Sequence, residues 1–261
     1  MVLSGDLSES SVRTAMSGRS VRVYPALLST EADAMAWARS GARTGSVVVA
    51  DYQASPRGRG GWPWSVEPGR GLGFSVVFRP DLSSSREGWG YVAASVALAE
   101  VLADGDTVLE WPDFVDHAKT GDRLAALGVY VHLGADTVEW IVVTVLVVGA
   151  TPPRAQLLAS CVEAIETRMH ADAGGVLDDY RARCATLHRT VRARLVPLGP
   201  GGPQVSGQAV DVLSDGALVL LTARGNRVAV PPHSLGLLEE AQTDFDDPAG
   251  EELSGSGDGR G

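Results

Sequence analysis

The chain has 261 residues, of which 44% are hydrophobic and 21% are charged, and its formal net charge is −10. This length suits one large domain, or a medium domain followed by a small one, and the apolar content is sufficient for a core. The longest apolar run, WIVVTVLVVGA, is far shorter than the roughly 18 residues of a membrane-spanning helix. Because the first residues also lack the pattern of a signal peptide, we expect a globular cytoplasmic protein with no membrane partner.

The acidic charge is concentrated at the C-terminus. Residues 239–261 carry eight acids and one arginine, so this segment accounts for −7 of the net charge. It is rich in Gly, Ser and Asp, and we expect a disordered, solubilising tail without a nucleic-acid partner. Cys161 and Cys184 are too few and too far apart for a disulfide framework or a CxxC metal site, which favours a reducing compartment.

Residues 1–19 are predicted to be a flexible polar leader. Beyond them, helical patterns and apolar runs alternate up to residue 188. Strands are predicted in VRVYPALL, SVVVADY, GLGFSVVFRP, TVLEWP, RLAALGVYVHLG and TVEWIVVTVLVVG, and helices in STEADAMAWARSG, GYVAASVALAEVLADG, 153–169 and VLDDYRARCATLH. The segment DFVDHAKTGD is predicted to be a loop. Neighbouring strands of the second half look antiparallel, so we predict an α+β fold with a mixed, largely antiparallel sheet covered by helices.

The pattern changes near residue 189. Four short strands, TVRARLVPL, VSGQAVDVL, ALVLLTA and RVAVPP, are separated by the turn-forming segments GPGGPQ, SDG and RGN. Evenly spaced short strands with such turns are typical of a small antiparallel barrel. We therefore predict a first domain over residues 20–188, a second over residues 189–238, and then the tail of residues 239–261.

One loop carries a chemical signal. ASPRGRGGWPW, residues 54–64, follows the predicted strand SVVVADY and holds two arginines among its glycines. Glycine lets a backbone fold over an anion, and Arg57 and Arg59 provide permanently charged donors for phosphate or carboxylate. The loop does not match the phosphate-binding pattern GxxxxGK[ST]. Its alternative interpretation is a solvated surface hairpin.

The order of these segments resembles the biotin protein ligase family from about Tyr24 to Leu237. VYPALLSTEADAMAWARSG is similar to the family's Ser-Thr-Asn segment, and VVVADYQ to its strand leading to a biotin-binding Gln. EPGRGLGFSVVFRP is similar to the strand after the loop, and YRARC with VSGQAVDVLSDGALVL to the junction and barrel. The resemblance does not extend to the N-terminal DNA-binding helices of some members. It implies a catalytic domain like those of class II aminoacyl-tRNA synthetases, followed by an SH3-like barrel.

The resemblance also implies an activity: ATP-dependent formation of biotinyl-AMP, with Mg²⁺, and transfer of biotin to a lysine of the biotin carboxyl carrier domain of an acyl-CoA carboxylase. Fixed cations would neutralise the charge that builds up when a carboxylate attacks a phosphate, and a closing loop would shield the adenylate from water. The implied biotin-binding residues are Ser29, Thr30, Gln53, Gly58 and Trp64. The implied nucleotide-binding residues are Arg57, Arg59, Trp62 and Trp111, of which the two arginines also count as catalytic candidates.

The chain departs from the family at several of these positions. The usual loop GRGRxGRxW has Pro56 for its first glycine and Trp62 for its third arginine, and the usual KWPND is EWPDF at residues 110–114. Arg123 stands where the K.AG segment has its catalytic lysine, keeping the charge but not the compact ammonium. Lys119 is a second candidate for that role.

These departures leave two alternatives open. One is a non-catalytic descendant that binds biotin or a partner protein, and the other is a related acyl-ligase such as a lipoate ligase. The histidines show no metal-ligand spacing. Asp113 and Asp116 are either a pair that contacts Mg²⁺ or ordinary solvated acids of a polar loop, and we predict no resident metal site.

Overall fold

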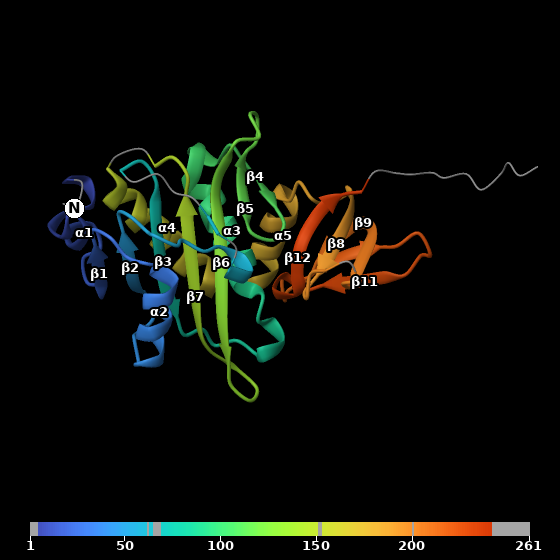
Figure 1. Cartoon of the computed structure of the whole chain (residues 1–261), viewed down its shortest axis with the longest axis horizontal. Coiled ribbons are helices and arrows are strands. Elements are labelled where there is room, and N and C mark those ends of the chain that lie inside the picture. The colour runs from blue at the N-terminus through green and yellow to red at the C-terminus, as the bar shows by residue number, and fades with distance from the viewer. Residues whose placement is uncertain (1–4, 62, 65–68, 151–152, 200, 242–261) are drawn as a thin grey trace, which may run out of the picture.

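Two β-sheets organise the computed structural model, which describes residues 5–61, 63–64, 69–150, 153–199 and 201–241 (Figure 1). A seven-stranded sheet forms the larger part, and a five-stranded sheet lies at the C-terminal side of the molecule. Trp62 and residues 242–261 lie outside the described residues, so the predictions for them remain predictions.

The larger sheet has the strand order β1-β2-β3-β7-β6-β5-β4. The pair β1–β2 is parallel and the other five pairs are antiparallel. This confirms the mixed, largely antiparallel sheet. The strands are β1 Val21–Tyr24, β2 Ser46–Ala50, β3 Leu72–Phe78, β4 Thr107–Glu110, β5 Phe114–His117, β6 Arg123–Leu133 and β7 Val138–Val147.

Strand β5 corrects the prediction of a loop at DFVDHAKTGD. Val115 is fully buried and pairs with Leu109 of β4 and Ala125 of β6. Because the apolar residues Phe114 and Val115 are adjacent and stand between charged residues, the segment lacks the alternation that predicts a strand. The partners on both sides, rather than local sequence, hold β5 in the sheet.

The larger sheet is buried on both faces, which explains its β-branched runs. Val47 and Val49 of β2 join the main core, whereas Val48 between them packs into a second cluster with Ala34 and Ala38. Successive side chains of a strand point to opposite faces, so one short run feeds both cores. Helix α2 covers one face, and α3 and α4 cover the other (Figure 1).

The helices are α1 Glu9–Ala15, α2 Thr30–Arg39, α3 Trp89–Val101, α4 Arg154–His170 and α5 Ala173–Arg183. Every residue of α3 from Trp89 to Ala99 is buried, as expected of a helix that is apolar all round and lies between a sheet and a second helix layer. In the described part of the chain, no helix combines the length and apolar character needed to cross a membrane.

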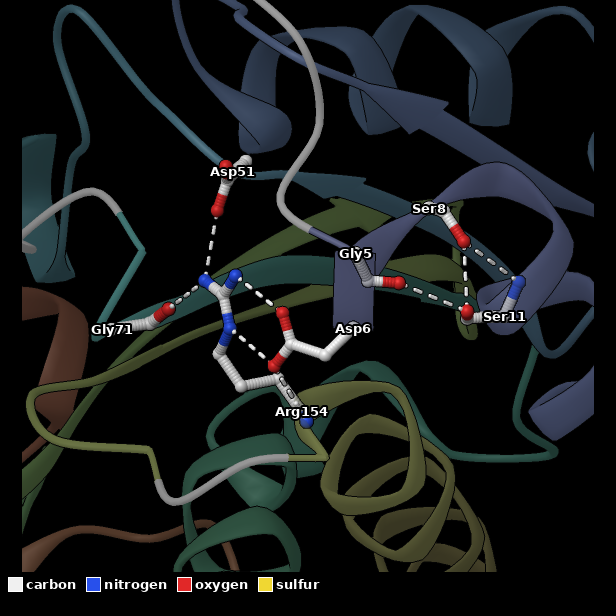
Figure 2. A network of polar contacts seen from close by, with 7 residues as sticks. All are labelled: Gly5, Asp6, Ser8, Ser11, Asp51, Gly71 and Arg154. Carbon is white, nitrogen blue, oxygen red and sulfur yellow. Dashed lines mark hydrogen bonds and ion pairs between the residues drawn. The ribbon is translucent and has the colours of Figure 1, made fainter.

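Residues 5–19 are not the flexible leader that the sequence predicts. They contain a 3-10 turn, Gly5–Leu7, and helix α1, and Leu7, Val12 and Met16 are buried in the main core. Asp6 of the turn is bound by Arg154 at the start of α4 (Figure 2). Polar residues separate Leu7, Val12 and Met16 in the sequence, so the sequence pattern does not predict that this segment packs on the core.

The second sheet has the antiparallel order β11-β10-β9-β8-β12. Four of its strands match the predicted ones, and β12 was missed. Within the described residues β11 and β12 are its two edges, so the sheet is open and a closed barrel is not confirmed. The strands are β8 Thr190–Leu195, β9 Gln204–Val212, β10 Leu218–Leu221, β11 Arg227–Val230 and β12 Leu235–Glu240.

Trp111 joins the two sheets. Its backbone N–H donates to Thr186 Oγ1 over 2.9 Å, and its indole Nε1 donates to the Gly216 carbonyl over 2.8 Å. The side chain is 2% exposed, so both bonds lie in the interior. Trp111 thus follows β4 of the first sheet and binds the turn before β10 of the second.

Replacing Trp111 by Phe tests this junction. The substitution keeps an aromatic ring but leaves the buried Gly216 carbonyl without its donor, and we expect the free energy of unfolding to fall by about 1–3 kcal/mol. Urea denaturation followed by circular dichroism measures the change. An unchanged free energy would show that the bond does not stabilise the junction.

Candidate active site

The segment after β2 carries Gln53 to the start of α2. Leu27 donates its N–H to the Tyr52 carbonyl and Ala54 donates to the Leu27 carbonyl, each over 2.9 Å. These bonds extend the parallel β1–β2 pairing beyond the strands, up to the N-terminal residues Ser29 and Thr30 of α2. The segment that holds Ser29 and Thr30 and the segment that ends at Gln53 therefore lie side by side.

A row of polar side chains leads from the half-buried Gln53 to fully buried hydroxyl groups. The Gln53 Oε1 accepts hydrogen bonds from the Thr30 backbone N–H over 2.8 Å and from the Thr30 hydroxyl over 3.1 Å. The Ser75 hydroxyl donates to Thr30 Oγ1 over 2.9 Å and lies 2.8 Å from Thr144 Oγ1. Thr30, Ser75 and Thr144 are all at most 1% exposed. We call Thr30, Gln53, Ser75 and Thr144 the polar row.

Gly73 makes room for the end of this row. A Cβ at position 73 would lie 2.2 Å from Gln53 Nε2, so a larger residue would displace the Gln53 amide. Ser29 is buried beside the row, but its side chain makes no capping hydrogen bond in α2. The structure thus places Ser29 and Thr30 at the start of α2, where Thr30 is bound to Gln53. That these residues bind biotin stays a prediction.

The glycine-arginine loop lies over β6 of the larger sheet. Gly58 is buried, and its carbonyl carbon would lie 3.1 Å from a Cβ at Gly128 of β6. Gly60 and Gly61 adopt positive φ angles of 62° and 78°, which glycine adopts without strain. The glycines therefore let the loop bend closely over the sheet.

The two arginines of this loop differ in their surroundings. Arg57 is exposed and donates to the Gly61 carbonyl within the loop over 3.3 Å. Arg59 is turned inward: its Nε lies 3.2 Å from Asp113 Oδ2, and its guanidinium also donates to the Leu235 carbonyl of β12. Arg59 therefore connects the loop to both sheets.

A cavity of about 470 Å³ opens beside Arg59, between the two sheets. The rings of Trp64 and Phe114 form part of its wall, with their centroids 5.7 Å apart and their planes tilted by 31°. Trp111 also contributes to the wall, although its indole N–H is bound to Gly216. The lining also holds a second arginine, Arg189, and four acids, Glu110, Asp113, Glu239 and Glu240. The aromatic wall suits a flat ligand, and Arg59 offers a cation to an anionic group of that ligand.

Two buried polar atoms in this wall have no hydrogen-bond partner among the described residues: Asp113 Oδ1 and Trp64 Nε1. Burial raises the pKa of Asp113 to about 6, although Arg59 acts in the opposite direction. A ligand that donates to Asp113 and accepts from Trp64 would satisfy both atoms.

Arg123 and Lys119, the two candidates for the lysine's role, lie in different settings. Arg123 forms ion pairs with Asp116 over 2.5 Å and Glu110 over 3.3 Å, and its guanidinium lies 3.4 Å from the centre of the Phe114 ring. Phe114 and Glu110 line the cavity, so Arg123 stands directly behind its wall. Lys119 is 79% exposed and pairs with Asp106, and it is not among the residues of the cavity.

Comparison with known proteins assigns the chain to a family. No protein-family model matches the sequence. Over 244 residues the chain is 30% identical to the biotin–[acetyl-CoA-carboxylase] ligase of Mycobacterium tuberculosis, an alignment that covers 82% of this chain and 90% of that relative. The chain belongs to the biotin protein ligase family. A shorter match, 31% identity over 116 residues, covers 42% of the chain and 36% of the bifunctional ligase/repressor BirA of Bacillus subtilis.

Solved structures of biotin protein ligases share the fold. The enzyme from Aquifex aeolicus in complex with biotin and ATP has a TM-score of 0.64 at 17% identity, and the match covers 85% of this chain and 99% of that one. The Helicobacter pylori biotin acetyl coenzyme A carboxylase synthetase has a TM-score of 0.56 at 18% identity, over 81% of this chain and 99% of that one. The larger sheet and its helices therefore have the biotin protein ligase fold.

Three residues of the candidate active site were not predicted from the sequence to belong to it. Ser75 and Thr144 lie on neighbouring strands in apolar runs, where a single polar residue gives no spacing signal. The largely apolar strand β7 supplies Thr144 to the polar row. Phe114 stood out only as a departure from the family, yet its ring forms cavity wall and covers Arg123.

The described residues contain no group of three His, Cys, Asp or Glu side chains placed to hold a metal ion. Asp113 and Asp116 are both buried, each with an arginine partner, and are not the solvated pair that one interpretation of the sequence offers.

Asp113 should make stability depend on pH. Its folded-state pKa of about 6 lies above the ordinary value of 3.8, so the folded state keeps a proton that the unfolded chain loses between these values. The contribution of this raised pKa to the free energy of unfolding is fully present below about pH 4 and is lost above about pH 6. Relative to Asp113→Asn, the wild type should lose about 3 kcal/mol of unfolding free energy across this window. Urea denaturation at several pH values measures this, and parallel pH profiles would contradict the assignment.

Proposed function

We propose that this chain is an ATP-dependent biotin protein ligase. The biotin carboxylate attacks the α-phosphorus of ATP, pyrophosphate leaves, and biotinyl-AMP forms. The amine of a lysine on a biotin carboxyl carrier domain of an acyl-CoA carboxylase then attacks the biotinyl carbonyl, and AMP leaves. The observation that carries the proposal is the pair of hydrogen bonds between Thr30 and Gln53, together with the cationic glycine loop, in a chain of this family.

In this proposal the polar row recognises the ring system of biotin. Ser29 and Thr30 supply buried hydroxyl groups, and the half-buried Gln53 supplies an amide, in a setting where hydrogen bonds to a ligand are stronger than in water. Gly58 brings the loop backbone close to the same region, and Trp64 adds an apolar wall. A ureido group offers both donors and acceptors to match these side chains.

The nucleotide occupies the cavity between the sheets in this proposal. Arg59 exchanges Asp113 for a phosphate or for the biotin carboxylate, and Arg57 is exposed and able to join it. Asp113 Oδ1 and Trp64 Nε1 match a nucleobase that carries both donors and acceptors. Trp62 is proposed as a nucleotide contact from the family resemblance, and Trp111 as part of the wall.

Mg²⁺ enters this proposal as the counter-ion of ATP. The described residues offer no cluster of ligands for it, so we assign it no protein ligand. Its charge would offset the negative charge that the attacking carboxylate brings to the phosphates. Arg59 and Arg57 supply fixed positive charge for the same step.

We further propose that residues 20–188 form the catalytic domain and residues 189–238 a separate SH3-like module. The strand composition on either side of residue 189 supports this division, and β8–β12 have the order of a small antiparallel module. We place the reaction in the cytoplasm, where ATP is present and cysteines stay reduced. Cys161 and Cys184 are free and buried, in keeping with that compartment.

A second candidate function is a ligase-fold protein that binds biotin without transferring it. Arg123 favours this alternative because its guanidinium is already engaged by Asp116, Glu110 and the Phe114 ring. Such a cation is less available to a reacting group than a free lysine ammonium. The two functions differ in a single measurable step, the formation of biotinyl-AMP.

The proposal is tested by incubating the full chain with biotin, ATP and Mg²⁺ and following biotinyl-AMP and its transfer to a carrier domain. Gln53→Met removes the amide from the polar row and should raise KM for biotin tenfold to a hundredfold, equivalent to about 1.4–3 kcal/mol. Gln208→Met, which removes an exposed amide on β9, is the matched control. Biotin binding without biotinyl-AMP would establish the second candidate instead.

Arg123 and Lys119 are separated in the same assay. Arg123→Ala should lower kcat for adenylate formation by about a hundredfold if its cation stabilises the developing charge. Lys119→Ala should leave kcat within twofold, because Lys119 is exposed and bound to Asp106. The reverse pattern would place Lys119 in the reaction and require the loop to move.

A further inference from the structure

Arg154, the first residue of α4, is a fully buried arginine outside the site described above. A cation at a helix N-terminus is unfavourable in the field of the helix dipole, so its position requires compensation. Asp6 provides part of it: Arg154 Nε donates to Asp6 Oδ2 over 2.9 Å, and the far nitrogen donates to Oδ1 over 2.8 Å (Figure 2). These side-chain hydrogen bonds lower the pKa of Asp6 to about 2.

The other side of the guanidinium contacts the ends of two strands of the larger sheet. The remaining terminal nitrogen donates to Asp51 Oδ1 over 2.8 Å and to the Gly71 carbonyl over 3.0 Å (Figure 2). Asp51 directly follows β2, and Gly71 directly precedes β3. One side chain thus joins the N-terminal turn, α4 and the ends of two neighbouring strands.

These strand ends carry the two residues that define the end of the polar row. Gln53 comes two residues after Asp51, and Gly73 two residues after Gly71. The Gln53 amide lies directly over Gly73, with no room for even one extra carbon between them. Arg154 therefore bridges the two strand ends whose next residues bring the Gln53 amide and Gly73 together.

We propose that Arg154 is a positioning residue for biotin binding: by holding Asp51 and the Gly71 carbonyl together, it fixes the Gln53 amide above Gly73, and Asp6 holds Arg154 in place. The inference rests on the proposed ligase function. It makes the N-terminal turn part of the support of the biotin site. A small displacement of the Gln53 amide would weaken biotin binding. The cavity proposed for ATP is built from other elements and would stay unchanged.

Asp6 is itself held in a folded segment, which makes it a suitable anchor. The Ser8 hydroxyl accepts from the Ser11 N–H over 3.2 Å and caps α1, and the Ser11 hydroxyl donates to the Gly5 carbonyl over 3.1 Å (Figure 2). The turn that carries Asp6 is therefore hydrogen-bonded to α1, the helix that follows it in the chain. Leu7 of the turn is buried in the core.

The test compares three conservative substitutions. Asp51→Asn and Asp6→Asn each remove one carboxylate from Arg154 while keeping the shape of the side chain. Glu166→Gln is the matched control, because it removes the ion pair between Arg19 and α4, which also ties the N-terminal segment to that helix but makes no contact with Asp51 or Gly71. All three variants are assayed as full chains, with thermal unfolding as a check of folding.

We expect Asp51→Asn to raise KM for biotin about tenfold and Asp6→Asn to raise it severalfold, with KM for ATP within twofold of wild type in both. Glu166→Gln should leave both KM values unchanged. Equal effects on biotin and ATP, or equal effects of all three variants, would show that Arg154 is merely structural and would overturn the proposal.

Hydrogen exchange gives a readout that does not depend on activity. The Ala54 and Ser55 N–H groups donate to the Leu27 and Leu28 carbonyls next to Gln53, over 2.9 and 2.8 Å. Their exchange should accelerate at least fivefold in Asp6→Asn but not in Glu166→Gln. A wild type that forms no biotinyl-AMP would defeat the proposed function alone, whereas unchanged exchange in Asp6→Asn would defeat the positioning claim.

Discussion

The site depends on one cation, Arg59, held between two sheets. Its ion pair with Asp113 reaches the larger sheet, and its bond to the Leu235 carbonyl reaches β12 of the smaller one. The glycine-arginine loop, the cavity and the edge of the second sheet take their relative positions from these contacts. A phosphate or carboxylate of a ligand accepts the same kind of charge-assisted hydrogen bond from a guanidinium as Asp113 does.

The remaining features of the site follow from close approaches in the larger sheet. Gly128 lets the loop lie on β6, and Gly73 lets the Gln53 amide lie on β3. The polar row crosses between α2 and two central strands, where apolar residues surround it. Two residues that differ from the family's usual sequence have local consequences in the site. Asp113 gives Arg59 a charged partner, and Phe114 gives Arg123 an aromatic partner.

Much of the larger sheet could be predicted, because β2 and β7 contain runs of β-branched residues and β3 is a short, mostly apolar run, as is typical of buried strands. The meeting of Thr30 with Gln53 followed from the family resemblance. The role of Arg154 could not be predicted, since its partners Asp6 and Asp51 lie 148 and 103 residues away in the sequence. Strands β5 and β12 were missed because their pairing partners, not their own residues, define them.

Calorimetric titration of biotin into the full-length protein, repeated with Thr30→Val, tests the central claim most directly. Valine keeps the volume of Thr30 but removes the hydroxyl that links Gln53 to Ser75. The account predicts one biotin per chain in the wild type and clearly weaker binding in the variant. Absence of binding to the wild type, or equal affinity in both proteins, would contradict the assignment of the polar row as the biotin site.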